Sequence, residues 1–193
     1  MKQRMFNKTF AAGLAVFAFV ELFNITDAFI NGNLFSGKPS PVLLFTYMII
    51  GIVEETVFRI LPGRVFGGKL TSVKREAAFI IITSLAFGLF HLVNLLSGAS
   101  LSYTVLQIVF AASIGSFFCL LFLKTGSPVL IVVMHIAHDM ITGFNTPELT
   151  GGVIYSLPLS MRDIIVVAVQ ALIFVGFVIL FITADPAGGR KQV

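Results

Sequence analysis

Six stretches of mostly apolar residues, each close to 20 residues long, dominate this sequence. They are Phe10–Ile30, Pro41–Ile60, Ala77–Leu96, Tyr103–Leu123, Pro128–Phe144 and Ile164–Thr183. A helix needs about 20 residues to cross the roughly 30 Å hydrocarbon core of a bilayer. Hydrophobic residues make up 57% of the chain and charged residues only 11%, so a soluble domain of this length could not cover its apolar surface. The pattern predicts an all-α, polytopic membrane bundle of about six transmembrane helices.

Lys and Arg are distributed unevenly among the segments that join these stretches. With the N-terminus inside, the outer segments carry only Lys38 and Arg162, and all the other basic residues except Arg59 lie in the inner segments. Because basic residues favour the cytoplasmic side, we expect both termini to be cytoplasmic. The formal charge of +4 is explained by this bias and does not indicate nucleic-acid binding.

The chain shows no internal repeat and no linker, so we expect one membrane domain over residues 1–193. The basic segment Met1–Lys8 precedes an apolar run, as in a signal peptide, but no small-residue cleavage site follows; we expect an uncleaved first span. The single cysteine, Cys119, excludes an intrachain disulfide and is interpreted as a small packed apolar residue.

Three polar clusters interrupt the apolar stretches at Glu54–Arg59, Phe87–His91 and His135–Asp139. An ionisable side chain at the centre of a membrane helix costs about 2.5–3.5 kcal/mol on insertion scales. Residues this costly indicate a buried functional site. Two adjacent glutamates and histidines on two other helices are the groups needed to activate a water molecule.

The two glutamates of the first cluster are predicted to differ in role. Glu55 and Arg59 are four residues apart, so they lie on one helix face in the favourable order for an ion pair. Glu54 points about 100° away from Glu55, which leaves it free to act as a general base. A plain structural ion pair at a helix end is the alternative interpretation.

The three histidines differ in how clearly their neighbours indicate a role. Phe87 lies one turn before His91, on the same helix face. His135 and Asp139 are four residues apart, so the carboxylate can orient the imidazole. His138 is either a further ligand or a packing residue, and the sequence leaves both open. Glu21 and Asn24, three apart on the first span, could face the same polar cavity or lie elsewhere.

The ordered set Glu-Glu-x-x-x-Arg, Phe-x-x-x-His and His-x-x-x-Asp resembles the CPBP family, the CAAX protease and bacteriocin-processing or abortive-infection family, which includes the Ras-converting CAAX endopeptidases. The resemblance covers the core of about 41–144. Asp139 takes a position where many relatives have Asn.

The resemblance implies a glutamate-dependent intramembrane endopeptidase. By position, Glu54 would activate the attacking water and His91 would help bind it, and the oxyanion would be stabilised by His135 and Asp139. Glu55 and Arg59 would be the supporting pair. We expect no cofactor: Glu54, His91 and His135 could form a His₂Glu zinc site, but that assignment would use up the general base.

Counted along the predicted spans, Glu54 and His91 lie at different depths in the membrane. With a rise of about 1.5 Å per residue, Glu54 lies nearer the inner end of its span and His91 nearer the outer end of its own. The two would differ in depth by about 10 Å. A deeper second span, a third helix that begins at Ser72–Arg75, or steep helix tilts would each remove the difference.

Two other function classes remain open. A non-catalytic membrane scaffold or regulator of the same family would catalyse no reaction. A proton-coupled transporter could use the same acids and histidines as a proton relay. The expected partners of a protease are a membrane-associated protein or peptide substrate and the lipid bilayer. A chain this small is typical of a prokaryotic protein, so we expect it in a prokaryotic cell membrane. The outer segment Gly143–Arg162 could gate access or simply connect two spans.

Overall fold

The computed structural model describes residues 2–38, 40–145 and 159–184, and the described chain is a bundle of helices without strands. The helices are α1 (Lys2–Ile30), α2 (Pro41–Glu55), η1 (Thr56–Ile60), α3 (Leu61–Phe66), η2 (Gly67–Lys69), α4 (Val73–Phe90), η3 (His91–Ser97), α5 (Leu101–Thr125), α6 (Pro128–Asn145) and α7 (Met161–Ala184).

Six helical paths in the described residues are long and apolar enough to cross a membrane, as the sequence predicts. They run Lys8–Ile30, Pro41–Lys69, Val73–Ser97, Leu101–Thr125, Pro128–Asn145 and Met161–Thr183. The second and third paths are longer than the apolar stretches indicate, because polar residues continue both helices at one end. Most of the outer segment between α6 and α7, residues 146–158, lies outside the described residues.

Local sequence signals define the helix ends. Ser40, Ser72 and Ser100 each cap the following helix, since the serine side chain accepts a hydrogen bond from the backbone N–H three residues on. Gly126 ends α5 with a positive φ of 65°, a conformation that glycine adopts without strain. Pro128 then opens α6.

The second span changes its winding immediately after the paired glutamates. Thr56–Ile60 form a π-helical turn, and Pro62 lies in the first turn of α3 directly after it. Proline has no N–H to donate to the carbonyl four residues earlier, so a wider turn ahead of it accommodates the missing hydrogen bond. Arg59 therefore comes from a π turn.

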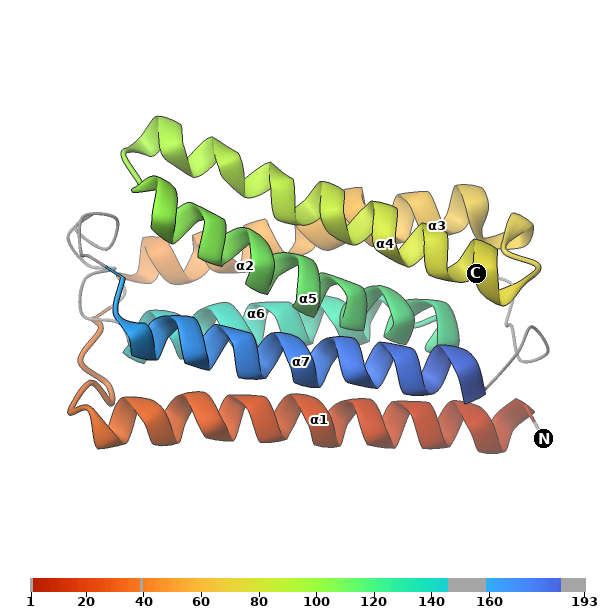
Figure 1. The fold of residues 1–193 in the computed structure, drawn as a ribbon, viewed down its shortest axis with the longest axis horizontal. Coiled ribbons are helices and arrows are strands. Elements are labelled where there is room, and N and C mark those ends of the chain that lie inside the picture. Colours follow the sequence, from red (N-terminus) through yellow and green to blue (C-terminus); the bar gives the residue numbers. More distant parts are fainter. Residues whose placement is uncertain (1, 39, 146–158, 185–193) are drawn as a thin grey trace.

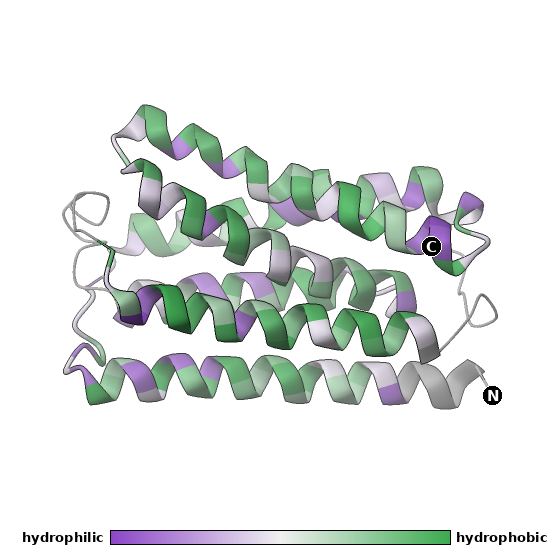
Figure 2. Ribbon diagram, in the orientation of Figure 1, coloured by the Kyte–Doolittle hydropathy of each residue, from purple (hydrophilic) through white to green (hydrophobic). Residues whose placement is uncertain are grey.

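α5 lies in the middle of the bundle, in contact with α1, α4, α6 and α7 (Figure 1). Most of its C-terminal half is buried, including Phe117, Phe118, Leu120, Leu121 and Phe122. The other helices are hydrophobic along most of their length, as Figure 2 shows. Many of their apolar side chains are exposed, as Leu96, 87% exposed, illustrates. Exposed apolar surface on every side is the expected outer face of a protein in lipid.

α4 and α5 approach each other closely at Gly88. A Cβ at this position would lie 2.8 Å from the backbone oxygen of Ile108 and 3.0 Å from the Cβ of Ala112. Ala112 is four residues before Ser116, and small residues at this spacing let membrane helices pack closely.

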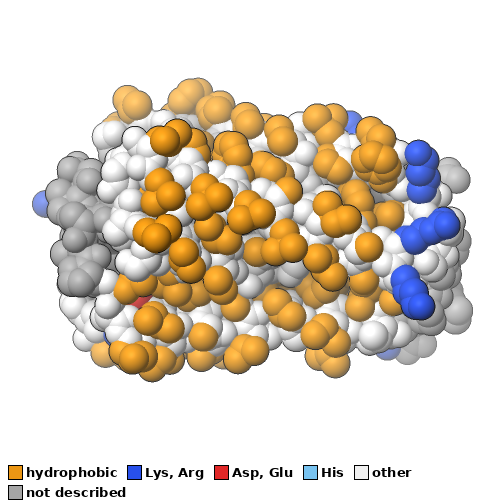
Figure 3. Space-filling model, turned by 45° about the horizontal axis from the view of Figure 1, so that its top comes forward, with side chains coloured by type: hydrophobic (Ala, Val, Ile, Leu, Met, Phe, Trp, Pro, Cys, Tyr) orange, Lys and Arg blue, Asp and Glu red, His pale blue; other side chains and the backbone are white. Residues whose placement is uncertain are grey.

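Basic side chains gather at one end of the bundle, as Figure 3 shows. This end holds the turn between α3 and α4, and there α1 begins and α7 ends (Figure 1). The described ends of the chain thus lie on one side, next to Arg64, Lys69, Lys74 and Arg75. This arrangement agrees with the charge bias, and the cytoplasmic orientation of that end stays a prediction.

The apparent depth difference between Glu54 and His91 is largely removed. α4 begins at Val73, which is one of the three explanations considered, and the second span also continues to Lys69. Measured from this common turn, Glu54 is 15 residues away and His91 is 18 residues away. At about 1.5 Å per residue the two differ in depth by only about 5 Å.

Candidate active site

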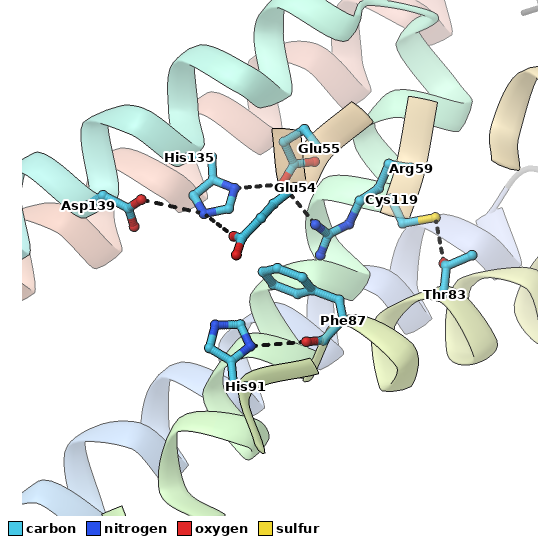
Figure 4. A network of polar contacts seen from close by, with 9 residues as sticks. All are labelled: Glu54, Glu55, Arg59, Thr83, Phe87, His91, Cys119, His135 and Asp139. Atoms are coloured by element: carbon cyan, nitrogen blue, oxygen red, sulfur yellow. Dashed lines mark hydrogen bonds and ion pairs between the residues drawn. The ribbon is translucent and has the colours of Figure 1, made fainter. Parts of the chain in front are cut away.

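A buried ion pair holds the centre of the site. Arg59 Nη1 donates to Glu55 Oε1 at 2.9 Å, and both side chains are 0% exposed. The same Glu55 oxygen lies 2.7 Å from Nδ1 of His135 (Figure 4). The pairing of Glu55 with Arg59 was expected from their spacing. The bond to His135, 80 residues away, was not, and it joins α2 to α6.

The guanidinium of Arg59 is held by packing as well as by charge. Its central carbon lies 3.8 Å from the centroid of the Phe87 ring, a cation–π contact. Gly115 of α5 lies beside both groups, since a Cβ there would collide with Nη2 of Arg59 and lie 3.1 Å from Cδ1 of Phe87. Among the described residues, Nε and Nη2 of Arg59 make no hydrogen bond. Glu55 is therefore the carboxylate that neutralises this buried cation.

Glu54 and Asp139 both face the other nitrogen of His135. Oε2 of Glu54 lies 3.5 Å from Nε2, and Oδ2 of Asp139 lies 3.7 Å from the same atom (Figure 4). Their side chains are 15% and 23% exposed. The two adjacent glutamates thus contact opposite nitrogens of one imidazole, and Glu54 stays at the accessible side.

His91 begins the 3-10 helix η3 and packs beside the same group. Its Nδ1 lies 3.0 Å from the backbone oxygen of Phe87. A carbonyl only accepts, so Nδ1 carries the proton, and a neutral ring then presents Nε2 as an acceptor. The Phe87 ring meets His91 edge-on with centroids 5.0 Å apart and His135 with centroids 6.0 Å apart. Phe87 thus packs against Arg59, His91 and His135 together.

Cys119 lies behind the site on α5 and is fully buried, in line with its interpretation as a packed residue. Its sulfur lies 3.5 Å from the hydroxyl of Thr83 on α4 (Figure 4).

A second polar cluster lies next to the site and joins α1, α6 and α7. His138 Nδ1 lies 2.8 Å from Oε1 of Glu21, and Asn24 donates to the other Glu21 oxygen at 3.2 Å. Gln170 of α7 donates to Asn24. The ring of Phe110 stacks on His138 with centroids 5.1 Å apart.

This second cluster bears on two questions that the sequence left open. Glu21 and Asn24 bond to His138 and Gln170, and none of their hydrogen bonds to described residues reaches Glu54. His138 pairs with Glu21 and stacks on Phe110. Sequence reasoning missed Gln170, although it is an isolated polar residue in the most hydrophobic span, whose mean hydropathy is 3.0.

The residues considered as zinc ligands are not arranged as a metal centre here. Among the described residues, no group of three or more His, Cys, Asp or Glu is placed to hold a metal ion. Glu54 approaches Nε2 of His135.

The fold and site define a class, a multi-pass membrane protein with buried acids and histidines from three spans. Comparison with family models gives the family: the model for type II CAAX prenyl endopeptidase Rce1-like proteins matches residues 36–141, more than half of the chain. The chain therefore belongs to this family of membrane proteases, whose substrates are peptides or proteins. No curated protein and no solved structure matches the chain.

The family match spans α2 to the last turns of α6 but omits α1 and α7. The residues around His135 all lie inside it. Glu21, Asn24 and Gln170 of the second cluster all lie outside it.

Proposed function

We propose that the chain is an intramembrane endopeptidase in which Glu54 activates water to hydrolyse a peptide bond of a membrane-associated protein or peptide. The observation that carries the proposal is the position of Glu54. It faces Nε2 of His135 from the accessible side, whereas Glu55 is fully buried between Arg59 and His135. A general base must be free to take a proton, and of the two glutamates Glu54 is the free one.

In the first step Glu54 takes a proton from water, and the resulting hydroxide attacks the carbonyl carbon of the substrate. His91 accepts a hydrogen bond from that water through Nε2, because Phe87 occupies its Nδ1. In the second step Glu54 returns the proton to the leaving nitrogen, and the C–N bond breaks. The products are a carboxylic acid and an amine. Glu54 alone therefore accepts and returns the transferred proton.

The oxyanion of the tetrahedral intermediate needs hydrogen-bond donors. His135 supplies Nε2–H in its doubly protonated form, with Nδ1–H held by Glu55. Asp139 supplies an O–H donor in its protonated form, since a carboxylate only accepts. Helices hold both donors in position before substrate binds, and such preorganisation is what makes stabilisation of an oxyanion effective.

The proposed chemistry needs no cofactor. The substrate class is a lipid-anchored or membrane-inserted polypeptide, and the proposed location is a prokaryotic cell membrane. The non-catalytic scaffold is the alternative that fails if hydrolysis is found.

The test compares wild type with Glu54→Gln in lipid vesicles. The probes are quenched fluorescent peptides with a prenyl anchor, an acyl anchor or no anchor. Glutamine keeps the size and hydrogen bonding of the side chain but removes the base, so cleavage should fall at least ~100-fold while the protein still folds. Cleavage by the variant at the wild-type rate would refute the mechanism.

A further inference from the structure

A pair of amide side chains lies one turn outward of His91. Asn94 of η3 donates from Nδ2 to Oε1 of Gln107 on α5 at 2.8 Å. We propose that this pair binds one backbone peptide group of an extended substrate and sets its position relative to the scissile bond. The proposal rests on the proposed function, because it assigns a substrate to that site.

The 3-10 winding of η3 places Asn94 and His91 on one face. In a 3-10 helix, residues three apart eclipse each other. The residues between and after them, Leu92, Val93 and Leu96, are 43%, 45% and 87% exposed. His91 and Asn94 are only partly exposed. This face therefore points into the bundle, where His91 meets Phe87.

Gln107 lies on the inward face of α5. Thr104 and Ala111, three residues before and four after it, are 0% and 3% exposed. Two other residues of the same helix also face the polar clusters: Phe110 stacks on His138, and Gly115 lies against Arg59. Gln107 itself is only partly buried. Its partial exposure leaves Gln107 within reach of a ligand.

The pair is half satisfied within the protein. Oδ1 of Asn94 and Nε2 of Gln107 make no hydrogen bond to described residues. They offer one acceptor and one donor, the complement of the N–H and C=O of a peptide backbone. Exchanging the amide orientations leaves one donor and one acceptor as before. The helices do not depend on this bond for contact, because Gly88 already brings α4 against the backbone of α5.

The spacing also fits an extended chain. Three residues of 3-10 helix rise about 6 Å, which is close to the rise of about 6.6 Å over two residues of an extended strand. With His91 beside the attacking water, Asn94 reaches the peptide group about two residues from the scissile bond.

The first test measures kcat and KM for Asn94→Ala with a quenched peptide that the wild type cleaves. Losing one hydrogen bond to bound substrate should raise KM about 3- to 10-fold and leave kcat unchanged. Asn31→Ala is the matched control, since Asn31 bonds to Asp27 at the outer end of α1. The double variant Asn94→Leu/Gln107→Leu removes both amides together and leaves neither stranded, so it should fold and raise KM at least as much as Asn94→Ala.

The second test replaces one peptide bond of the substrate at a time by an ester, which removes its N–H. Wild type should lose affinity at one position about two residues from the cleaved bond, and Asn94→Ala should show no further loss there. Unchanged KM in both variants, or additive losses at every position, would overturn the binding site. Such a result leaves the proposed function standing if Glu54→Gln is inactive; activity in Glu54→Gln would remove the function itself.

Discussion

Two histidines one turn apart on α6 lie in two different polar clusters. His138 belongs to a closed cluster: both oxygens of Glu21 are bonded, and Asn24 and Gln170 complete the chain of bonds. His135 belongs to an open one: one nitrogen is held by Glu55 at 2.7 Å, and the other faces two carboxylates at 3.5 and 3.7 Å.

The difference separates a structural cluster from a reactive one. The Glu21 side chain is 6% exposed, against 15% for Glu54. Groups whose hydrogen bonds are already made resist change, whereas accessible groups beyond ordinary hydrogen-bond length can engage water and substrate. The closed cluster joins α1 and α7 to α6, and the open one is where chemistry is expected.

The largest expected effect is on stability, within the open cluster. Glu55→Ala strands Arg59 and His135 in the bundle interior, and breaking a buried pair costs roughly 3–5 kcal/mol. Thermal unfolding in detergent should show this loss, together with lost activity. Glu54→Ala removes a partly exposed side chain and should melt close to wild type. Equal losses for the two alanine variants would contradict the division of roles.

The second effect separates the two histidines. His135→Ala removes an oxyanion donor and should lower kcat about 10²–10³-fold. His138→Ala breaks the closed cluster, so it should lower the melting temperature while folded molecules keep their kcat. The measurement is kcat per folded molecule for each variant. Similar losses of kcat in both variants would mean that the two clusters act as one.

The smallest expected effect is that of chelation. Prolonged dialysis against a metal chelator should leave cleavage unchanged, and elemental analysis should find less than one zinc per chain. One zinc per chain that is lost with activity and restored with it would instead make Glu54, His91 and His135 ligands.

Residues close in sequence were predicted well. The six spans follow from apolar runs, and the Glu55–Arg59 pair follows from helical spacing. The contacts between spans could not be predicted in the same way. Spacing carries no information about which helix faces which, so the bond from Glu55 to His135 and the pairing of Glu21 with His138 emerged only from packing.

Helix irregularities were also missed. The π turn before Pro62 and the 3-10 turn from His91 change where side chains point, whereas residue spacing was counted as for a regular α-helix. The extra helical turns at Gly67–Lys69 and Val73–Glu76 lie beyond the apolar runs. Their omission from the predicted spans produced the apparent depth difference between Glu54 and His91.

The most direct test of the comparison places Glu54→Gln and Glu21→Gln in one cleavage assay. Both changes neutralise an acid next to a histidine of α6, and they differ in the cluster to which that acid belongs. The account predicts that Glu54→Gln loses at least ~100-fold in cleavage while Glu21→Gln cleaves like wild type. Wild-type cleavage by Glu54→Gln, or equal loss in both variants, would contradict it.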